Sequence, residues 1–381
     1  YNPAFDSVAD FLERSFTVPM FARELKKLGH VVQVVHPFPS DESFELEGVA
    51  YRLVRPAWLW GAAGRVAARL LGGFPYPYYQ LATRMVPLIE HFSPDVVHFF
   101  GLTLDPNLWL ISRWAEQARV PLVVHFHGGQ AATRAPRRLL QRHNLQRARR
   151  LLFTLREQAC SWVEEGLLTE PAKVVELMET SSLFAWRPRA GARAETGMEG
   201  NPVFLSAGRL SPEKDPLALL RGFARIRERW PEVHLYLYYL RADMLAEISD
   251  FIKQDPLLDG AVHLRGTVPF SQMEAVYNSA DFLLQGSLRE WSGCTVLEAM
   301  SCGVIPIVTD IPTFRRMTKR GHYGRLFPPG DADALARETL AISDHEIPAL
   351  SAAVRDHFER TFSFPVLAKQ LEGIYREVTT Q

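Results

Sequence analysis

Apolar runs of strand length alternate with helical segments along most of the 381-residue chain. The stretch 17–29 has helical spacing and ends at Gly29, a residue typical of a helix C-terminus. The run VVQVV (31–35) that follows resembles a parallel strand buried on both faces. Repeated alternation of this kind predicts an α/β fold with parallel sheets.

The same alternation continues through both halves of the chain. Further strands are predicted at 95–100, 120–129, 151–155, 203–208, 234–240, 261–266, 281–286 and 304–310. Helices are predicted at 106–118, 135–148, 215–229, 242–253, 271–279, 294–302 and, last, near 364–378.

The alternation lapses once, at residues 187–201, which are rich in Gly, Ala, Arg and Glu and lack an apolar stripe. We therefore predict an exposed linker at 187–201 between two doubly wound, Rossmann-like domains, 1–186 and 202–363. Ligands of such sheets bind beyond the carboxyl ends of the strands, so we expect the two domains to face each other across a cleft.

Composition narrows the class of protein. Lys+Arg and Asp+Glu both number 43, and this zero net charge argues against nucleic acid as the main partner. Three cysteines are too few and too scattered for a disulfide framework or a zinc site, which favours a reducing, cytoplasmic setting. Apolar runs stay well below the roughly 20 residues of a membrane span.

A loop with two cations follows the strand 203–208, in the sequence SAGRLSPEKDP (206–216). Arg209 and Lys214 lie on this loop, just before a helix start. Two cations beside backbone N–H groups form an anion site suited to a diphosphate. The alternative is a solvated loop with a Glu213–Lys214 surface pair.

A second loop leads into the helix predicted at 294–302. We expect Ser292 to cap this helix, and the first helical turn to offer backbone N–H groups to a ligand. These groups belong to Gly293, Cys294 and Thr295.

Two glutamates flank that helix start, Glu290 before it and Glu298 about one turn inside it. A carboxylate accepts hydrogen bonds from vicinal hydroxyls, so the pair can hold two different sugars on either side of one anion. Alternatively, Glu290 is a solvated loop residue and Glu298 only interacts with the helix dipole.

Histidines end the strand VVHFHGG (123–129). His125 and His127 lie on one face of it, but a metal site needs a third ligand, and none is evident at suitable spacing. We expect His127 to hydrogen-bond a substrate at the strand tip, and His125 and His98 to be structural. Asp331 in D-A-D (331–333) is expected to cap a helix and not to bind a metal.

Two segments are basic. Arg134–Arg150 holds seven arginines interleaved with leucines, and residues 65–86 mix arginine with aromatic residues. A cationic amphipathic face can rest on anionic lipid or hold an anionic acceptor. The alternative is a solvated helix face with core-facing leucines.

Together these motifs resemble the GT-B glycosyltransferases of family 4, which are retaining and nucleotide-sugar dependent. GSLREWSGCTVLEAMSCGVIPIVTD is similar to the family's E-x7-E signature, AGRLSPEKDPLALLRGFARI to its phosphate loop, and GRLFPPGDADALA to a later segment. VVHFHGG and ELKKLGHVVQVV resemble parts of its first domain. The resemblance spans nearly the whole chain.

The resemblance implies a role for each candidate residue. Arg209 and Lys214 neutralise the donor diphosphate, Glu298 binds the nucleotide ribose, and Glu290 binds hydroxyls of the transferred sugar. The remaining contacts are backbone N–H groups of Gly293, Cys294 and Thr295 for sugar and phosphate, main chain at Thr267 and Val268 for the base, and His127 for the reaction centre.

The resemblance also implies the reaction. A hexose moves from a UDP- or GDP-sugar to a hydroxyl of a glycan, lipid-linked or small-molecule acceptor, without a metal or other cofactor, as in polysaccharide biosynthesis. The leaving phosphate takes the acceptor proton on the same face. The C-terminal segment, 364–381, returns to the first domain. The protein is then cytoplasmic, with peripheral contact to the inner face of the membrane through Arg134–Arg150.

Two other functions are compatible with the same motifs. One is a GT-B nucleotide-sugar hydrolase or epimerase, and the other is a non-catalytic nucleotide-sugar-binding module. The chain also departs from the family pattern: its opening, YNPAFDSVADFLERSF, lacks the family's first strand and Gly-Gly loop. Trp291 and Ser292 replace a Gly-aromatic pair beside Glu290, and LYYLRADM (237–244) lacks the usual glycines.

Overall fold

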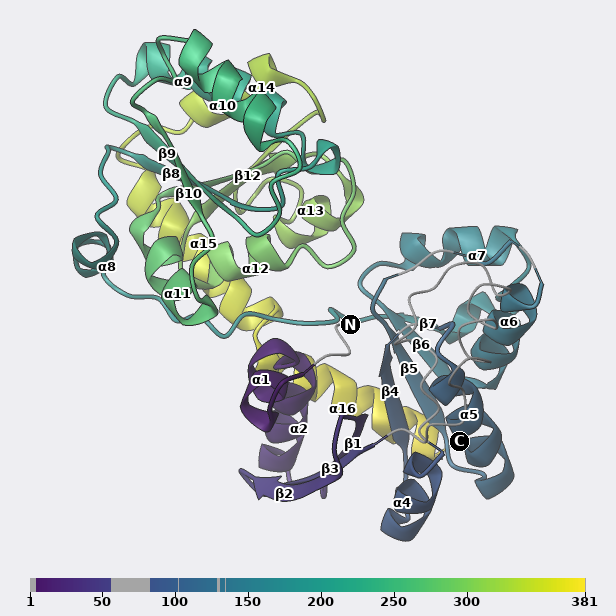
Figure 1. The fold of residues 1–381 in the computed structure, drawn as a ribbon. Coiled ribbons are helices and arrows are strands. Elements are labelled where there is room, and N and C mark those ends of the chain that lie inside the picture. Colours follow the sequence, from purple (N-terminus) through teal and green to yellow (C-terminus); the bar gives the residue numbers. More distant parts are fainter. Residues whose placement is uncertain (1–4, 56–82, 102, 129–130, 134, 381) are drawn as a thin grey trace. The chain divides into compact units, whose positions relative to one another are not determined.

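A computed structural model describes residues 5–55, 83–101, 103–128, 131–133 and 135–380. Arg134 and most of the basic segment 65–86 lie outside these residues. The chain forms two compact units, one made of residues up to Thr180 together with those from Phe364, and the other of Ser181–Ser363. Both are mixtures of helices and mainly parallel strands, which confirms the predicted α/β class (Figure 1).

The second unit is built on a six-stranded, fully parallel sheet in the order β10-β9-β8-β11-β12-β13. Its strands are β8 (Val203–Gly208), β9 (His234–Tyr239), β10 (Val262–Gly266), β11 (Phe282–Gln285), β12 (Ile305–Thr309) and β13 (Arg325–Phe327). All residues of β11 and β12 are buried, as expected of central strands covered on both faces.

Helices cover both faces of this sheet. In Figure 1, α9, α10 and α14 lie on one side and α11, α12 and α15 on the other. The helices of this unit are α8 (Arg189–Thr196), α9 (Pro216–Arg229), α10 (Leu245–Gln254), α11 (Phe270–Ser279), α12 (Cys294–Ser301), α13 (Pro312–Met317), α14 (Ala332–Leu340) and α15 (Ile347–Thr361). Asp331 caps α14 by accepting a hydrogen bond from the Ala334 N–H at 2.8 Å, as expected.

The segment expected to be an exposed linker, 187–201, contains helix α8 and belongs to the second unit. This helix is held by polar contacts and not by an apolar stripe. Arg189 and Arg193 form ion pairs with Asp281 at 3.0 and 2.6 Å, and Arg189 also donates to the Ala280 carbonyl. Only Ala192 of α8 is buried, which explains why its periodicity gave no helical signal.

The first unit contains two sheets. One has the order β1-β3-β2, with β1 (Gln33–Pro37) parallel to β3 (Val49–Val54) and β2 (Glu42–Leu46) antiparallel to β3. The other is parallel, in the order β4-β5-β6-β7. Its strands are β4 (Val97–Gly101), β5 (Leu122–Phe126), β6 (Arg150–Phe153) and β7 (Val174–Glu176). The β2–β3 hairpin was not predicted from the sequence.

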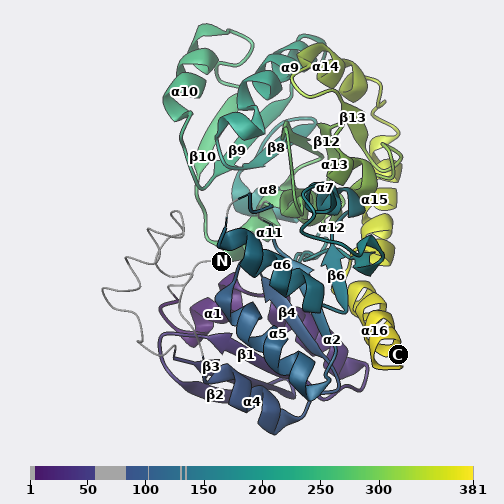
Figure 2. The ribbon, with the colours of Figure 1, turned by 90° about the vertical axis from the view of Figure 1, so that its right-hand side faces the viewer.

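The helices of the first unit include one from each end of the chain. They are α1 (Val8–Arg14), α2 (Thr17–Lys27), α4 (Met85–Phe92), α5 (Pro106–Ala118), α6 (Arg137–Arg147), α7 (Cys160–Glu164) and α16 (Phe364–Thr380). Helix α16 packs along α2 (Figure 2), and its Tyr375 hydroxyl lies 2.6 Å from Nδ1 of His98 in β4.

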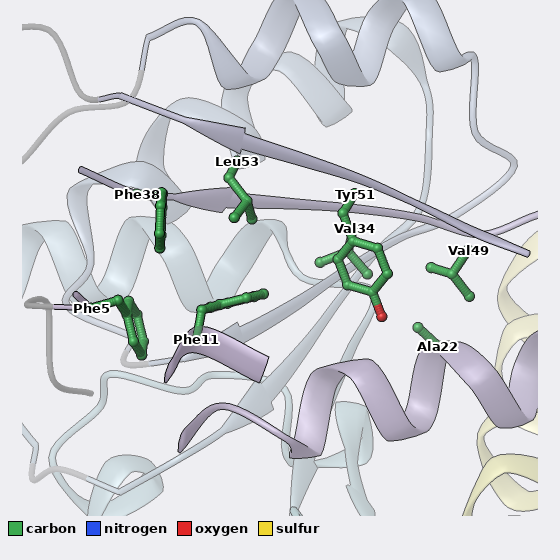
Figure 3. Packing of buried hydrophobic residues seen from close by; sticks show 8 residues of the cluster. All are labelled: Phe5, Phe11, Ala22, Val34, Phe38, Val49, Tyr51 and Leu53. Carbon is green, nitrogen blue, oxygen red and sulfur yellow. The ribbon is translucent and has the colours of Figure 1, made fainter. Parts of the chain in front are cut away.

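An aromatic core joins α1 and α2 to the β1–β3 sheet (Figure 3). Phe5 and Phe11 pack edge to face, with ring centroids 5.4 Å apart, and Phe5 stacks on Phe38 just beyond β1. The remaining members of this core are Ala22, Val34, Val49, Tyr51 and Leu53.

Candidate active site

The loop after β8 carries both predicted cations. Arg209 follows the strand, is about half exposed, and lies 3.5 Å from Glu213. Lys214 ends a short 3-10 turn, Pro212–Lys214, and its side chain is largely buried. Both residues line a small cavity at the carboxyl end of β8, together with Gly208, Tyr238 and Gln285.

Lys214 forms an ion pair with Glu290, whose side chain is 16% exposed. The Ser287 hydroxyl donates to the same carboxylate oxygen at 2.7 Å, and the Thr313 hydroxyl donates to the Glu290 carbonyl at 2.9 Å. A charge pair removed from water needs such further hydrogen bonds, because desolvation opposes it. In place of the Glu213–Lys214 surface pair that was the alternative to an anion site, the structure has the pairs Arg209–Glu213 and Lys214–Glu290.

Close backbone packing at Gly286 sets the distance between the two loops. A Cβ atom at Gly286 would lie 2.9 Å from the Lys214 carbonyl oxygen and 3.1 Å from that of Asp215. The Leu288 N–H also donates to the Glu213 carbonyl at 2.9 Å. The segment that follows β11 is thus held in contact with the loop after β8, which carries Lys214.

The residue that caps α12 is Gly293 and not Ser292, so that expectation is wrong. Gly293 has a left-handed backbone, with φ of 65°, and no side-chain cap. A Cβ there would meet Met317 Sδ at 3.0 Å and Phe314 at 3.2 Å. Packing against α13 therefore selects glycine, and Ser292 instead lies 3.3 Å from the Cys294 sulfur. The first turn of α12 contains Cys294 and Thr295, as expected.

Glu298 lies further along α12, and its carboxylate accepts a 2.6 Å hydrogen bond from the Tyr277 hydroxyl. Burial raises the pKa of Glu298 to about 7, and the Tyr277 hydrogen bond opposes that rise. A carboxyl with this pKa changes its charge near neutral pH, which is typical of groups at functional sites.

The loop after β10 carries the residues expected near the base. The Thr267 hydroxyl donates to the Tyr239 carbonyl at 3.0 Å, which fixes this loop to the end of β9. Thr267 is exposed and Val268 is half-buried, and α11 begins two residues after Val268. Their main chain therefore lies at the same edge of the sheet as the loop after β8, since all these strands are parallel.

His127 belongs to the first unit, where it directly follows β5. Its Nδ1 lies 3.7 Å from a Glu179 carboxylate oxygen, and its ring is 5.5 Å from that of Phe100. Burial lowers the pKa of His127, while Glu179 acts in the opposite direction. The Nε2 atom is buried, and no described residue bonds to it. Burial thus favours the neutral form of His127, and its ring is held from one side by Glu179.

The two other histidines are structural, as expected. His125 is fully buried, and its Nε2 lies 3.4 Å from the Leu177 carbonyl. His98 is held by Tyr375, and burial lowers its pKa to about 3. Within the part of the chain that the structure describes, no group of three or more His, Cys, Asp and Glu side chains could hold a metal ion.

The structure brings some of the predicted site residues into contact and shows further residues that hydrogen-bond to them. Lys214 and Glu290 are in contact, Arg209 lies at the same strand end, and Glu298 contacts Tyr277 on a neighbouring helix. Sequence reasoning missed Tyr277, Ser287 and Thr313, whose hydrogen bonds hold the two glutamates. They are isolated polar residues in apolar surroundings, so no spacing pattern distinguishes them.

The basic helix α6 keeps an exposed leucine, Leu139, which is 65% exposed. Two of its arginines are paired, Arg138 with Glu165 at 3.5 Å and Arg147 with Glu116 at 2.8 Å. None of the described helices has the length and apolar character to cross a membrane.

Comparison with known proteins identifies the family. The model for "Glycosyl transferases group 1" matches residues 190–353, and the model for "Glycosyl transferase 4-like domain" matches residues 16–177. The phosphatidyl-myo-inositol mannosyltransferase of Mycolicibacterium smegmatis is 25% identical over 75% of this chain and 72% of its own. The D-inositol 3-phosphate glycosyltransferase of Saccharomonospora viridis is 33% identical over 51% of this chain, which spans about half (48%) of that relative's length.

A solved structure agrees in fold. Anabaena Alr3699/HepE, described in complex with UDP-glucose, superposes with a TM-score of 0.66 at 16% identity, over 94% of each chain. The two family models follow each other along the chain in the order of the two units. The chain therefore belongs to the GT-B glycosyltransferases of family 4.

Proposed function

We propose that this protein transfers a hexose from a nucleoside-diphosphate sugar to an acceptor hydroxyl, with retention of configuration and without a metal. The observation that carries the proposal is the largely buried Lys214–Glu290 pair beside Arg209 at the carboxyl end of β8. A cation held this way is preorganised for charge that develops on a leaving diphosphate.

Donor binding follows from the charges and donors at this edge of the sheet. Arg209 and Lys214 contact the diphosphate, and the first N–H groups of α12, at Gly293, Cys294 and Thr295, add hydrogen bonds. The Thr267–Val268 main chain contacts the base. A UDP-sugar is the favoured donor because the Anabaena protein of the same fold is described with UDP-glucose, and a GDP-sugar is the alternative.

Each glutamate binds one sugar. Glu298 accepts hydrogen bonds from the ribose hydroxyls, because a hydrogen bond from the Tyr277 hydroxyl holds its carboxylate in position. Glu290 accepts from hydroxyls of the transferred hexose, and binding exchanges part of its contact with Lys214 for contacts with substrate. Lys214 is then released toward the diphosphate, which couples recognition of the sugar to stabilisation of the leaving group.

The reaction breaks the bond from the anomeric carbon to the diphosphate oxygen and forms a bond from that carbon to the acceptor oxygen. The acceptor proton passes to the departing phosphate oxygen on the same face. No protein base is required, and His127 of the first unit hydrogen-bonds the substrate. The two cations stabilise the charge on the leaving nucleoside diphosphate.

The acceptor is a hydroxyl of a glycan, of a lipid-linked molecule or of a small molecule. The names of two relatives mention phosphatidyl-myo-inositol and D-inositol 3-phosphate. These names support an anionic polyol as the acceptor, either lipid-linked or a small molecule. The Arg134–Arg150 segment, with exposed Leu139, is proposed to rest on anionic lipid, which places the enzyme at the cytoplasmic face of a membrane. Arg134 itself lies outside the described residues.

The proposal is tested by turnover of UDP-glucose and GDP-mannose with inositol-type acceptors. Lys214→Ala should lower kcat by about 10²-fold or more, on the scale seen when a preorganised charge donor is removed. The matched control is Lys253→Ala on α10, an exposed lysine of the same unit, which should leave kcat unchanged. Equal rates for both variants would refute the role of Lys214.

A nucleotide-sugar hydrolase is the second candidate. It differs in one measurable way, because it consumes donor at its full rate when no acceptor is present. A glycosyltransferase should release nucleotide much faster with acceptor than without it.

The domain limits 1–186, 202–363 and 364–381 stay proposals for the extent of this protein's acceptor and donor parts.

A further inference from the structure

A short segment after β7 carries a buried carboxylate to the end of β5. The Leu177 N–H donates at 2.8 Å to the carbonyl of Phe153, the last residue of β6. The Leu177 carbonyl lies 3.4 Å from Nε2 of His125 in β5. The segment thus passes the carboxyl ends of β6 and β5, which are neighbours in the sheet. Two residues later it brings Glu179 to His127, which directly follows β5.

The backbone is fixed on both sides of Glu179. Leu177 is held by its bonds to β6 and β5 on one side. On the other side, the Thr180 hydroxyl lies 2.7 Å from the hydroxyl of Thr17, the first residue of α2. The place of the Glu179 carboxylate beside His127 is therefore set by contacts within the first unit and not by an exposed loop.

A buried carboxylate is unfavourable unless a partner offsets its loss of hydration. Glu179 is 8% exposed, and among the described residues only His127 forms an ion pair or hydrogen bond with its side chain. A single ion pair at 3.7 Å does not normally offset that loss. Stability of the fold therefore does not explain a glutamate here, whereas an effect of its charge on His127 does.

The other side of the His127 ring is open. Its Nε2 atom is buried and has no hydrogen-bond partner among the described residues. A pair that served stability alone would be expected to satisfy both ring nitrogens, because buried polar atoms of folded proteins are almost always paired. One held nitrogen opposite one unsatisfied nitrogen is the arrangement expected when a substrate is the second partner.

The carboxylate decides which ring nitrogen carries the proton. An ionised carboxylate only accepts hydrogen bonds, so Glu179 favours a proton on Nδ1, the His127 nitrogen that faces it. The neutral ring then keeps its lone pair on Nε2, which can accept a hydrogen bond but cannot donate one. The distance of 3.7 Å exceeds a direct hydrogen bond, so the attraction between the two side chains is mainly electrostatic.

We propose that Glu179 is a positioning residue: it fixes the His127 tautomer with the proton on Nδ1, so that Nε2 accepts a hydrogen bond from a hydroxyl group of the substrate. The group recognised there is a hydrogen-bond donor and not a phosphate or carbonyl oxygen. The hydroxyl belongs either to the transferred hexose or to the acceptor. The identity of the substrate rests on the proposed function, whereas the tautomer does not.

The tautomer can be observed without turnover. The full chain with ¹⁵N-labelled histidine is measured by NMR at pH 8, above the ordinary histidine pKa of about 6.5, and the His127 signals are those lost in His127→Ala. Nitrogen shifts distinguish a protonated ring nitrogen from one with a lone pair. We expect the Nδ1–H form in the wild-type protein and in Glu179→Asp. We expect the Nε2–H form or a mixture in Glu179→Gln, whose amide can also donate. A wild-type ring protonated on Nε2, or the same ring in Glu179→Gln as in wild type, would overturn the proposal.

Turnover then tests what the tautomer does. Glu179→Gln should lower kcat/KM by about tenfold or more, on the scale seen when a partner that orients a histidine is removed. The matched control is Glu170→Gln, an exposed glutamate of the same unit, which should leave kcat/KM unchanged. In the His127→Ala background, Glu179→Gln should have no further effect, because Glu179 acts through that ring. An equal loss in both backgrounds would contradict a positioning role.

The two substrates separate the possible sources of the hydroxyl. A higher KM for the donor in Glu179→Gln assigns the hydroxyl to the hexose, and a higher KM for the acceptor assigns it to the acceptor. A wild-type chain that turns over no nucleotide sugar would refute the proposed function and leave the NMR result in place. An active wild-type chain with the proton on Nε2 would refute only the role of Glu179.

Discussion

Binding of the donor should depend on pH through Glu298. This carboxyl has a pKa of about 7 because it is buried, and its only described hydrogen-bond donor is Tyr277. A pKa raised in this way means that the carboxylate is present above pH 7 and lost below it. The ionised carboxylate accepts hydrogen bonds more strongly than the protonated form, in which one oxygen becomes a donor, so acid should weaken nucleotide binding.

The size of the effect follows from the fraction ionised. With the pKa of Glu298 at about 7, roughly one carboxyl in ten is ionised at pH 6 and nine in ten at pH 8. The Kd for donor should therefore be about tenfold higher at pH 6 than at pH 8 if the ionised form is required. Tyr277 lowers the pKa of Glu298, so Tyr277→Phe should move the transition to higher pH.

The assay is calorimetric titration with UDP-glucose, whose diphosphate is esterified at both ends and carries no phosphate proton that titrates near pH 6. Glu298→Gln is the control: it should bind donor weakly and with little pH dependence. A Kd that stays constant between pH 6 and pH 8 in the wild-type protein would refute the reasoning. So would an unchanged pH profile in Tyr277→Phe that still binds donor normally.

Three further predictions concern stability. Glu298→Gln should raise the free energy of unfolding at pH 8 by up to about 3 kcal/mol and much less at pH 4, because the raised pKa of Glu298 disfavours its ionised form in the folded state; urea titrations at both pH values check this. Gly286→Ala should lower the free energy of unfolding by about 1–3 kcal/mol, since its Cβ would lie 2.9 Å from the Lys214 carbonyl oxygen. Gly373→Ala is the control and should not destabilise the protein, because nothing lies within 4 Å of that position. The urea midpoints of the two variants test this difference. Asp331→Ala should lose about 1 kcal/mol with the cap of α14, and the exposed Asp333→Ala should lose less; equal losses in thermal melts would contradict the capping argument.

Helices with local signals were predictable from the sequence. Helix α5 occupies Pro106–Ala118 because Asp105 caps it, Pro106 starts it, and Arg119 ends it in a left-handed conformation. Each of these choices is made by residues adjacent in sequence, so 106–118 was predicted from the sequence alone. Strands β8 to β12 of the second unit were predicted for the same reason, because turn residues directly bound each apolar run, whereas β13 and the order of the strands in the sheet were not predicted.

Features that depend on distant contacts were not predictable. Helix α8 is held by the ion pairs of Arg189 and Arg193 with Asp281 and buries only Ala192, so it has no apolar stripe. The cap of α12 is Gly293 and not Ser292 because Met317 and Phe314 pack against it. In each case the deciding neighbour lies far away in the chain.

The candidate site divides in the same way. Arg209 and Lys214 stand out in sequence because they follow an apolar strand, and Glu290 and Glu298 because they flank a helix start and match the family's E-x7-E signature. Their partners do not stand out. Which cation pairs with Glu290 depends on the packing of Gly286 against the Lys214 loop, and the charge state of Glu298 depends on burial beside Tyr277.

The central claim is that Lys214, held by Glu290 at the end of β8, binds the diphosphate of a nucleotide. The most direct measurement is a thermal-shift screen with UDP, GDP, ADP and CMP, with and without magnesium. A nucleoside diphosphate present at ten times its Kd should add about 1.4 kcal/mol of stability. We predict that this gain appears without magnesium, persists in Lys253→Ala and is lost in Lys214→Ala. A gain of the same size in Lys214→Ala, or one that needs magnesium, would contradict the account.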